Sequence, residues 1–385
     1  MPIQRRSFLL GLGASGIVGT LGYVQKHQPT VDESLADVQR TFIASGTNCL
    51  KNRASHKGLI YGAATQQVIL SSDTTFATNF AQECEMLVPE WELKWKTLRP
   101  SSTQFDFTLG DWLVEFAQQN GQFFRGHTLL WHDALPDWFH TSINRQNAEA
   151  ILIDHIETVV KRYRGKVHSW DVVNEAINIR RFLGRPDGLR DSPWLAFLGE
   201  TYIDLAFHVA AQADPKALLV YNDYGLEYDT PGDEAKREAV LKLLERLKTQ
   251  GVPIHAFGMQ SHLDSSETRL NPKKLRQFLA DVASLGLKIL VTELDVTDKN
   301  LSANITVRDH TVAAAYEDYL NVVLDEPAVI AVLTWGLSDR YTWLSEFEPR
   351  PDGLPVRPLP LDANLNRKLA WNAMARAFDN APSRG

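Results

Sequence analysis

The sequence predicts an α/β fold of a single (β/α)8 barrel, the TIM-barrel architecture, over residues 58–380. Short apolar runs rich in β-branched residues alternate eight times with longer segments of helical periodicity. No second cluster of short strands indicates a separate β domain. The chain has 385 residues, and single barrels of this kind range from about 250 residues to about 400 with insertions.

Eight segments are predicted to form the strands of the barrel, and a helix candidate follows each of them. The strands are expected at 59–65, 86–90, 123–131, 168–175, 217–223, 256–262, 288–296 and 331–338. Residues 147–164 illustrate the helices, because their apolar side chains form one stripe beside charged ones. A proline-rich loop is expected before a closing helix at 364–378. An open doubly wound sheet is the alternative, but no Gly-x-Gly-x-x-Gly opens the first strand-helix turn.

Composition and charge narrow the functional classes. With 44% hydrophobic and 23% charged residues, the chain is typical of a well-packed globular protein. Its formal net charge of −7 argues against a nucleic-acid partner, which usually requires a basic face. Cys49 and Cys84 are too few for a disulfide scaffold or a cysteine-based metal site, and they form either one bridge or two buried free thiols. We expect no cofactor and a monomer.

The first thirty residues resemble a bacterial twin-arginine export signal. Arg5 and Arg6 precede an apolar run that five glycines interrupt. Each glycine costs a helix about 1 kcal/mol relative to alanine, so an export signal at 1–30 is favoured over a membrane anchor or a cytoplasmic protein. No clear Ala-x-Ala site marks a cleavage point. Residues 31–57 are expected to be a linker, and the mature domain is expected to be periplasmic or secreted, without membrane contact.

Polar residues gather where the predicted strands end, which is where such a barrel carries its active site. Glu175 follows Asn174 at the end of the fourth strand, and Glu293 ends the seventh, two residues before Asp295. Strand alternation places Glu293 and Asp295 on one face, away from Thr292. A lone carboxyl is more often a helix cap or a salt bridge. Two across a cleft can cleave a glycosidic bond, one as proton donor and one as ionised nucleophile.

Six motifs in chain order make the prediction more specific. They are W-D-V-V-N-E-A at 170–176, V-T-E-L-D-V at 291–296, G-H-T-L-L-W-H at 126–132, G-M-Q-S-H-L at 258–263, Y-N-D-Y at 221–224 and T-W-G-L-S-D at 334–339. On these motifs the chain resembles glycoside hydrolase family 10, the endo-β-1,4-xylanase family, over roughly residues 58–380. The resemblance implies a retaining hydrolase of xylan that forms a covalent glycosyl-enzyme intermediate, with its two carboxyl groups about 5–5.5 Å apart.

The resemblance also implies a role for each matched residue. It makes Glu175 the general acid/base and Glu293 the nucleophile. His262 and Asp295 are expected to orient Glu293 and keep it ionised, and Asn174 to bind the 2-hydroxyl of the sugar being cleaved. The other expected contacts are Gln260 beside the acid/base, Lys94 and His127 at hydroxyls of the sugar on the non-reducing side, Glu90 beside Lys94 or the next sugar, Trp131, Trp335 and Trp343 as apolar walls, and Tyr224 on the leaving-group side.

Some neighbouring residues keep two interpretations. His132 is either a core histidine or part of the site, and the group 222–224 is either a loop anchor or a wall on the leaving-group side. Trp138 and Trp170 are expected to pack rather than to bind ligand. No catalytic metal is expected, because the histidines of these motifs lack the tight spacing of metal ligands.

Two departures from the family pattern fall in one pocket. This chain has E-W-E-L-K-W at 90–95 where the family has E-N-x-x-K-W, and W-H-D-A at 131–134 where the family has W-H-x-Q. Trp91 and Ala134 therefore replace two amides that bind the second sugar, and we expect an altered second-sugar subsite. The alternatives for the whole chain are a retaining β-glycanase on another polymer such as β-1,4-glucan, and a non-catalytic carbohydrate-binding barrel.

Overall fold

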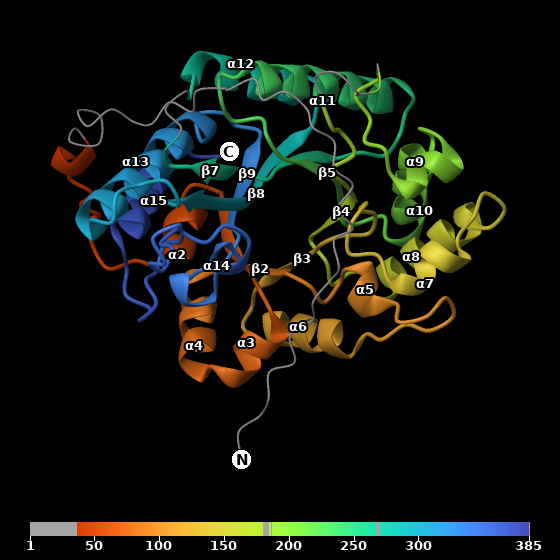
Figure 1. The fold of residues 1–385 in the computed structure, drawn as a ribbon, viewed down its shortest axis with the longest axis horizontal. Coiled ribbons are helices and arrows are strands. Elements are labelled where there is room, and N and C mark those ends of the chain that lie inside the picture. The colour runs from red at the N-terminus through yellow and green to blue at the C-terminus, as the bar shows by residue number, and fades with distance from the viewer. Residues whose placement is uncertain (1–36, 180–184, 186, 267–269, 385) are drawn as a thin grey trace.

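The computed structural model describes residues 37–179, 185, 187–266 and 270–384, so the predicted signal at 1–30 lies outside the described residues. A closed parallel barrel forms the centre of the molecule (Figure 1), with neighbouring strands in the order β6-β5-β4-β3-β2-β1-β9-β8 and a β6–β8 pairing that closes the ring. The predicted barrel is therefore confirmed. Its strands, with the short β7 added to β8, are β1 (Ile60–Thr65), β2 (Met86–Pro89), β3 (Phe123–Gly126), β4 (Ser169–Asn174), β5 (Leu218–Asp223), β6 (Ala256–Met259), β7 (His262–Asp264), β8 (Lys288–Thr297) and β9 (Val329–Thr334).

Helices surround this ring of strands (Figure 1). The predicted helix at 147–164 is α8, and a long connection that carries the prolines separates β9 from the closing helix α15. The helices are α2 (Leu50–Ser55), α3 (Gln67–Ser72), α4 (Thr74–Glu83), α5 (Trp95–Leu98), α6 (Thr108–Gln119), α7 (Asp137–Ser142), α8 (Ala148–Arg162), α9 (Pro193–Leu198), α10 (Tyr202–Ala213), α11 (Pro231–Thr249), α12 (Pro272–Ser284), α13 (Ile305–Val323), the 3-10 turn η1 (Asp339–Tyr341), α14 (Leu344–Phe347) and α15 (Leu369–Asn380).

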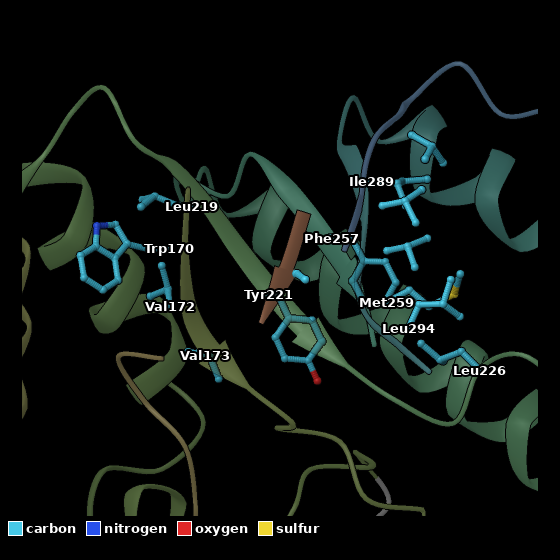
Figure 2. Packing of buried hydrophobic residues seen from close by; sticks show 14 of the residues in the cluster. Trp170, Val172, Val173, Leu219, Tyr221, Leu226, Phe257, Met259, Ile289 and Leu294 are labelled. Carbon is cyan, nitrogen blue, oxygen red and sulfur yellow. The ribbon is translucent and has the colours of Figure 1, made fainter. Parts of the chain in front are cut away.

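Alternate residues of the strands belong to two separate apolar cores, as strand geometry requires. Val220 lies in the small core inside the barrel, whereas its neighbours Leu219 and Tyr221 lie in the large core between strands and helices. Figure 2 shows part of this outer core, to which β4, β5, β6 and β8 contribute. Trp170 packs there against Gly126, where an added Cβ would lie 2.1 Å from the indole. The expectation that Trp170 packs is confirmed.

Three predicted strands differ clearly from the expected bounds. The segment expected at 331–338 is β9 (Val329–Thr334), which ends four residues early. The segment 256–262 divides into β6 and β7, because Ser261 between them adopts a left-handed backbone with φ of 66°. The segment 123–131 ends as a strand at Gly126, and beyond it Leu130 makes only an isolated bridge to Val173. In these three segments, residues predicted to be at or near a strand end lie outside the strands instead, at 260–261, 127–131 and 335–338.

The boundary predicted between linker and barrel is wrong. Helix α2 lies inside the segment 31–57, its Leu50 and Ala54 are fully buried, and it packs against α15 and β1. The Leu50 amide also donates to the Glu83 carboxylate at 2.8 Å. The folded part therefore begins before residue 58. The closing helix begins at Leu369 rather than at 364.

Two further expectations concern the cysteines and membrane contact. Cys49 and Cys84 are both buried and free, so the free-thiol alternative is the one the structure has. Over the described ranges, no helix is both long enough and apolar enough to cross a membrane.

Candidate active site

A cleft of about 740 Å³ lies at the carboxyl ends of the barrel strands. Such a position is expected, because the loops after the strands build the active sites of barrels of this type. Every residue that the sequence assigned to the site lines this one cleft: Glu90, Lys94, His127, Trp131, Asn174, Glu175, Tyr224, Gln260, His262, Glu293, Asp295, Trp335 and Trp343.

The Glu293 carboxyl is buried and held on both oxygens. Asn222 Nδ2 donates to its Oε1 at 2.7 Å, and His262 Nε2 lies 3.3 Å from its Oε2. Burial alone would raise the pKa of Glu293, but the hydrogen bond from His262, the nearby His127 and the bond from Asn222 lower it below its usual value. Glu293 is therefore ionised near neutral pH, which is the state a nucleophile requires.

His262 is itself held by a second carboxylate. Its Nδ1 lies 2.9 Å from Asp295 Oδ1, and the indole of Trp343 donates to Asp295 Oδ2 at 2.7 Å. Burial favours the neutral imidazole, but Asp295 and Glu293 outweigh it and raise the pKa of His262 well above its usual value. The charged ring can donate to Glu293 and to Asp295 at once, so the geometry suits the supporting pair that the sequence predicts.

Glu175 experiences the opposite environment at the end of β4. Burial and the nearby Asp223 raise the pKa of Glu175, and a hydrogen bond from Gln260 Nε2 to Oε1 at 3.1 Å opposes them. The charge on Glu293 also raises it. Two carboxyl groups whose environments push their pKa values apart suit one acid and one base in the same cleft.

Two asparagines connect these carboxyl groups. Asn174 donates to Glu175 Oε1 at 3.3 Å, and its own oxygen accepts from Asn222 at 2.9 Å, while Asn222 also donates to Glu293. Gly258 makes room for this bridge, because a Cβ there would lie 2.3 Å from Asn222 Oδ1. The sequence named Asn222 only as a loop anchor or wall. Its position two residues after the inward-facing Val220 was the available signal.

Strict alternation was wrong at Thr292. Its hydroxyl donates to Asn222 Oδ1 at 2.7 Å, so Thr292 faces the same side of β8 as Glu293. The register between β8 and β9 shifts between Val291 and Leu294, and a bulge of this kind turns consecutive residues to one face.

His127 lies just beyond β3, and side chains inside the barrel hold its ring in place. Its Nδ1 is 2.9 Å from Asp171 Oδ2, and Arg125 binds both Asp171 and the Ser169 hydroxyl inside the barrel. All four side chains are buried. The contact engages Nδ1, so Nε2 is the ring nitrogen available to a ligand.

Three indoles surround the ammonium group of Lys94. Its Nζ lies 4.2 Å from the ring centroid of Trp91, 4.9 Å from that of Trp131 and 5.8 Å from that of Trp335. Burial lowers the pKa of Lys94, whereas the carboxylates of Glu293 and then Glu90 raise it. These contacts combine cation–π attraction with a charge held in the cleft.

The remaining predicted residues also have defined partners. Glu90 accepts a hydrogen bond from Gln66 at 3.0 Å, and the Tyr224 hydroxyl accepts one from Arg190 at 3.0 Å. His132 is not a core histidine, because it lines the cleft and its Nδ1 lies 3.9 Å from Glu175 Oε2. Trp138 packs against Trp95, as expected.

Comparison with known proteins then identifies the family. The sequence model of glycosyl hydrolase family 10 matches residues 49–377. The chain belongs to glycosyl hydrolase family 10. The resemblance that the six motifs indicate is thereby confirmed.

Individual members of this family align with the chain over most of their length. The chain is 38% identical to "Beta-1,4-xylanase" of Dictyoglomus thermophilum over 295 residues, which is 74% of this chain and 79% of that protein. It is 34% identical to "Endo-1,4-beta-xylanase 1" of Humicola insolens over 336 residues, or 85% and 73% of the two chains. Among solved structures, xylanase 10B from Thermotoga petrophila RKU-1 in complex with xylobiose has a TM-score of 0.79 at 33% identity, covering 87% and 98%.

The sequence did not single out Arg190 in this family 10 member, and the structure adds detail for Trp91. Arg190 contacts both Glu175 and Tyr224, but it lies in the loop between β4 and α9, where no strand-end pattern singles it out. The replacement residue Trp91 is 39% exposed and contacts Lys94 within the same cleft. In the described part of the chain, no group of three His, Cys, Asp or Glu residues is suited to hold a metal ion.

Proposed function

We propose that this protein is a retaining endo-1,4-β-xylanase that cleaves xylan by double displacement. One observation carries the proposal: Glu293 is held ionised by His262 and Asn222, while burial and Asp223 favour the protonated form of Glu175 in the same cleft. The relatives named as xylanases support xylan as the polymer.

The first displacement uses both carboxyl groups. Oε of Glu293 attacks the anomeric carbon, and the bond from that carbon to the glycosidic oxygen breaks. The electron pair stays on the departing oxygen, which takes the proton from Glu175. Asn174 contributes a hydrogen bond to the 2-hydroxyl, where a contact strengthens as the sugar becomes cationic.

The second displacement reverses these roles. Glu175, now a carboxylate, takes a proton from a water molecule whose oxygen attacks the anomeric carbon. The ester bond to Glu293 breaks, and the carboxylate returns to its bonds with His262 and Asn222. Each displacement inverts the anomeric centre, so the product keeps the β configuration.

Product stereochemistry tests this mechanism. In a ¹H NMR time course on xylohexaose, we expect β-anomeric xylo-oligosaccharides to appear first and to mutarotate later. First appearance of the α anomer would contradict double displacement. If reducing sugars were released faster from β-1,4-glucan than from xylan, the result would favour a β-glycanase that acts on another polymer.

The second-sugar subsite is proposed to bind by stacking rather than by hydrogen bonds. Trp91 presents an indole and Ala134 a methyl where the family pattern has two amides, and both residues line the cleft. Two lost hydrogen bonds weaken the binding of a polar xylose ring by about 0.5–1.5 kcal/mol each. An indole stacks on the C–H face of a sugar ring without using its hydroxyls, so such a subsite also accepts a sugar whose hydroxyls carry a substituent.

A double variant, Trp91→Asn with Ala134→Gln, tests this subsite. It should raise kcat/KM on unsubstituted xylotriose by roughly tenfold or more, as two hydrogen bonds allow. Aryl xylosides that occupy only the first sugar position are the matched control substrate and should change little. Equal kcat/KM on xylotriose for both proteins would rule the subsite proposal out.

A further inference from the structure

Arg190 connects the loop after β4 to the residue proposed as acid/base. Its Nε donates to the carbonyl oxygen of Glu175 at 2.7 Å, and its backbone amide donates to the carbonyl of Ala176 at 2.7 Å. Its Nη2 donates to the Tyr224 hydroxyl at 3.0 Å and lies 3.7 Å from Glu175 Oε2. The side chain is only 12% exposed, so these contacts form inside the cleft wall.

The backbone of Glu175 needs such support. Its φ is 57°, in the left-handed region that residues with a Cβ rarely adopt. A non-glycine residue there carries backbone strain, which persists only where the surrounding structure holds it. The carbonyl that Arg190 Nε binds belongs to this same residue, so the arginine acts where the strain lies.

Arg190 also brings a fixed charge to the Glu175 carboxyl. His132 lies 3.9 Å away, but burial and then Arg190 lower its pKa to about 4, so it is neutral at neutral pH. Asp223 forms an ion pair of 2.7 Å with Lys236 of α11. The other charged groups that act on this carboxyl are Glu293 on β8 and Lys94 before α5.

We propose that Arg190 is the positioning residue of the acid/base: it fixes the left-handed backbone of Glu175 and stabilises the carboxylate that forms when Glu175 donates its proton. The inference rests on the proposed function and deepens it. Two of its guanidinium nitrogens are engaged by the Glu175 carbonyl and the Tyr224 hydroxyl. The guanidinium is therefore near the carboxyl without a direct hydrogen bond in the resting protein, so Glu175 can still hold a proton.

The proton cycle explains why such a charge is useful. In the first displacement the proton of Glu175 passes to the glycosidic oxygen as the bond to the anomeric carbon breaks, which leaves a carboxylate beside Arg190. In the second displacement this carboxylate takes the proton of the attacking water. A nearby positive charge favours the intermediate state between the two transfers.

The pH dependence of kcat/KM tests the proposal, with xylotetraose as substrate because its sugar leaving group needs protonation by the acid. Activity requires protonated Glu175, so the basic limb falls as pH rises through its pKa. Arg190→Met removes a charge that favours the carboxylate, and the limb should move to higher pH by about one unit. Arg190→Lys keeps the charge and should keep the limb, with a lower kcat because the fork of donors is lost.

Arg185→Met is the matched control, because this arginine belongs to the same loop but pairs with Asp187 outside the cleft. It should leave the limb unchanged. The proposal would be overturned if the basic limb of the pH profile stayed in place in Arg190→Met. It would also be overturned if this limb had the same apparent pKa in the Met and Lys variants. If circular dichroism shows that Arg190→Met does not fold, Arg190→Gln also removes the charge, and the same shift of the basic limb is expected from it. A wild-type protein without hydrolysis would contradict the proposed function instead.

Discussion

The residues that distinguish the two carboxyl groups are their hydrogen-bond donors. Glu293 receives bonds from Asn222 and from a charged His262, and these outweigh its burial. Glu175 receives amide bonds from Gln260 and Asn174, but no charged donor among the described residues bonds to it, and burial together with Asp223 raises its pKa. The surroundings of two identical side chains thus move their pKa values in opposite directions.

A histidine variant tests this account of Glu293. Activity needs ionised Glu293, so the acid limb of kcat/KM falls as pH drops through its pKa. His262→Asn removes the charged donor, which should raise that pKa and move the acid limb to higher pH by about one unit. The pH profile on an aryl xylobioside measures the shift.

The exposed His140 of α7 provides the control, because it lies outside the cleft. His140→Asn should leave the acid limb in place. If His262→Asn leaves it in place as well, the bond to His262 does not control the ionisation of Glu293.

At the scale of single residues, the sequence singled out candidate catalytic residues but not the contacts that connect them. Glu175 and Glu293 stood out because acidic residues at strand ends are easily recognised. Asn222 and Arg190 did not, because their roles come from contacts between different strands and loops. Such contacts depend on the closed barrel and have no local spacing in the chain.

At the scale of elements, apolar periodicity predicted where strands begin better than how they end. The segment 256–262 contains one apolar run, yet Ser261 breaks it into β6 and β7. The bulge in β8 likewise turns Thr292 toward Asn222. These irregularities lie beside the proposed site, where regular alternation would direct side chains away from the cleft.

Helix α2 gives a stability prediction at this scale. Periodicity over six residues is too short to reveal a helix, but Leu50 is fully buried where α2 packs against α15. Leu50→Ala should lower the free energy of unfolding by about 2–5 kcal/mol, since it removes buried methyl groups and leaves a cavity. Urea denaturation monitored by tryptophan fluorescence measures the change.

Leu109→Ala is the matched control, because Leu109 of α6 is 40% exposed. Its effect should stay within about 0.5 kcal/mol. Equal losses for the two variants would mean that α2 does not belong to the folded core.

At the scale of the whole molecule, the segment 1–30 remains a prediction about export. Replacing Arg5 and Arg6 by lysine should retain folded, active enzyme in the cytoplasm of a bacterium with a twin-arginine pathway, since the paired arginines are the recognised feature. Xylanase activity in periplasmic and cytoplasmic fractions measures this. Lys26→Arg is the control, and undiminished export of the double lysine variant would contradict the prediction.

Covalent trapping tests the central claim most directly. The account requires a nucleophile at Glu293 that bonds to the sugar while Glu175 serves as the acid. Incubation with an activated 2-deoxy-2-fluoro xylobioside should therefore increase the protein mass by one glycosyl group, and peptide mapping should place that group on Glu293. Labelling of a different residue, or no labelling in a protein that still binds xylobiose, would contradict the account.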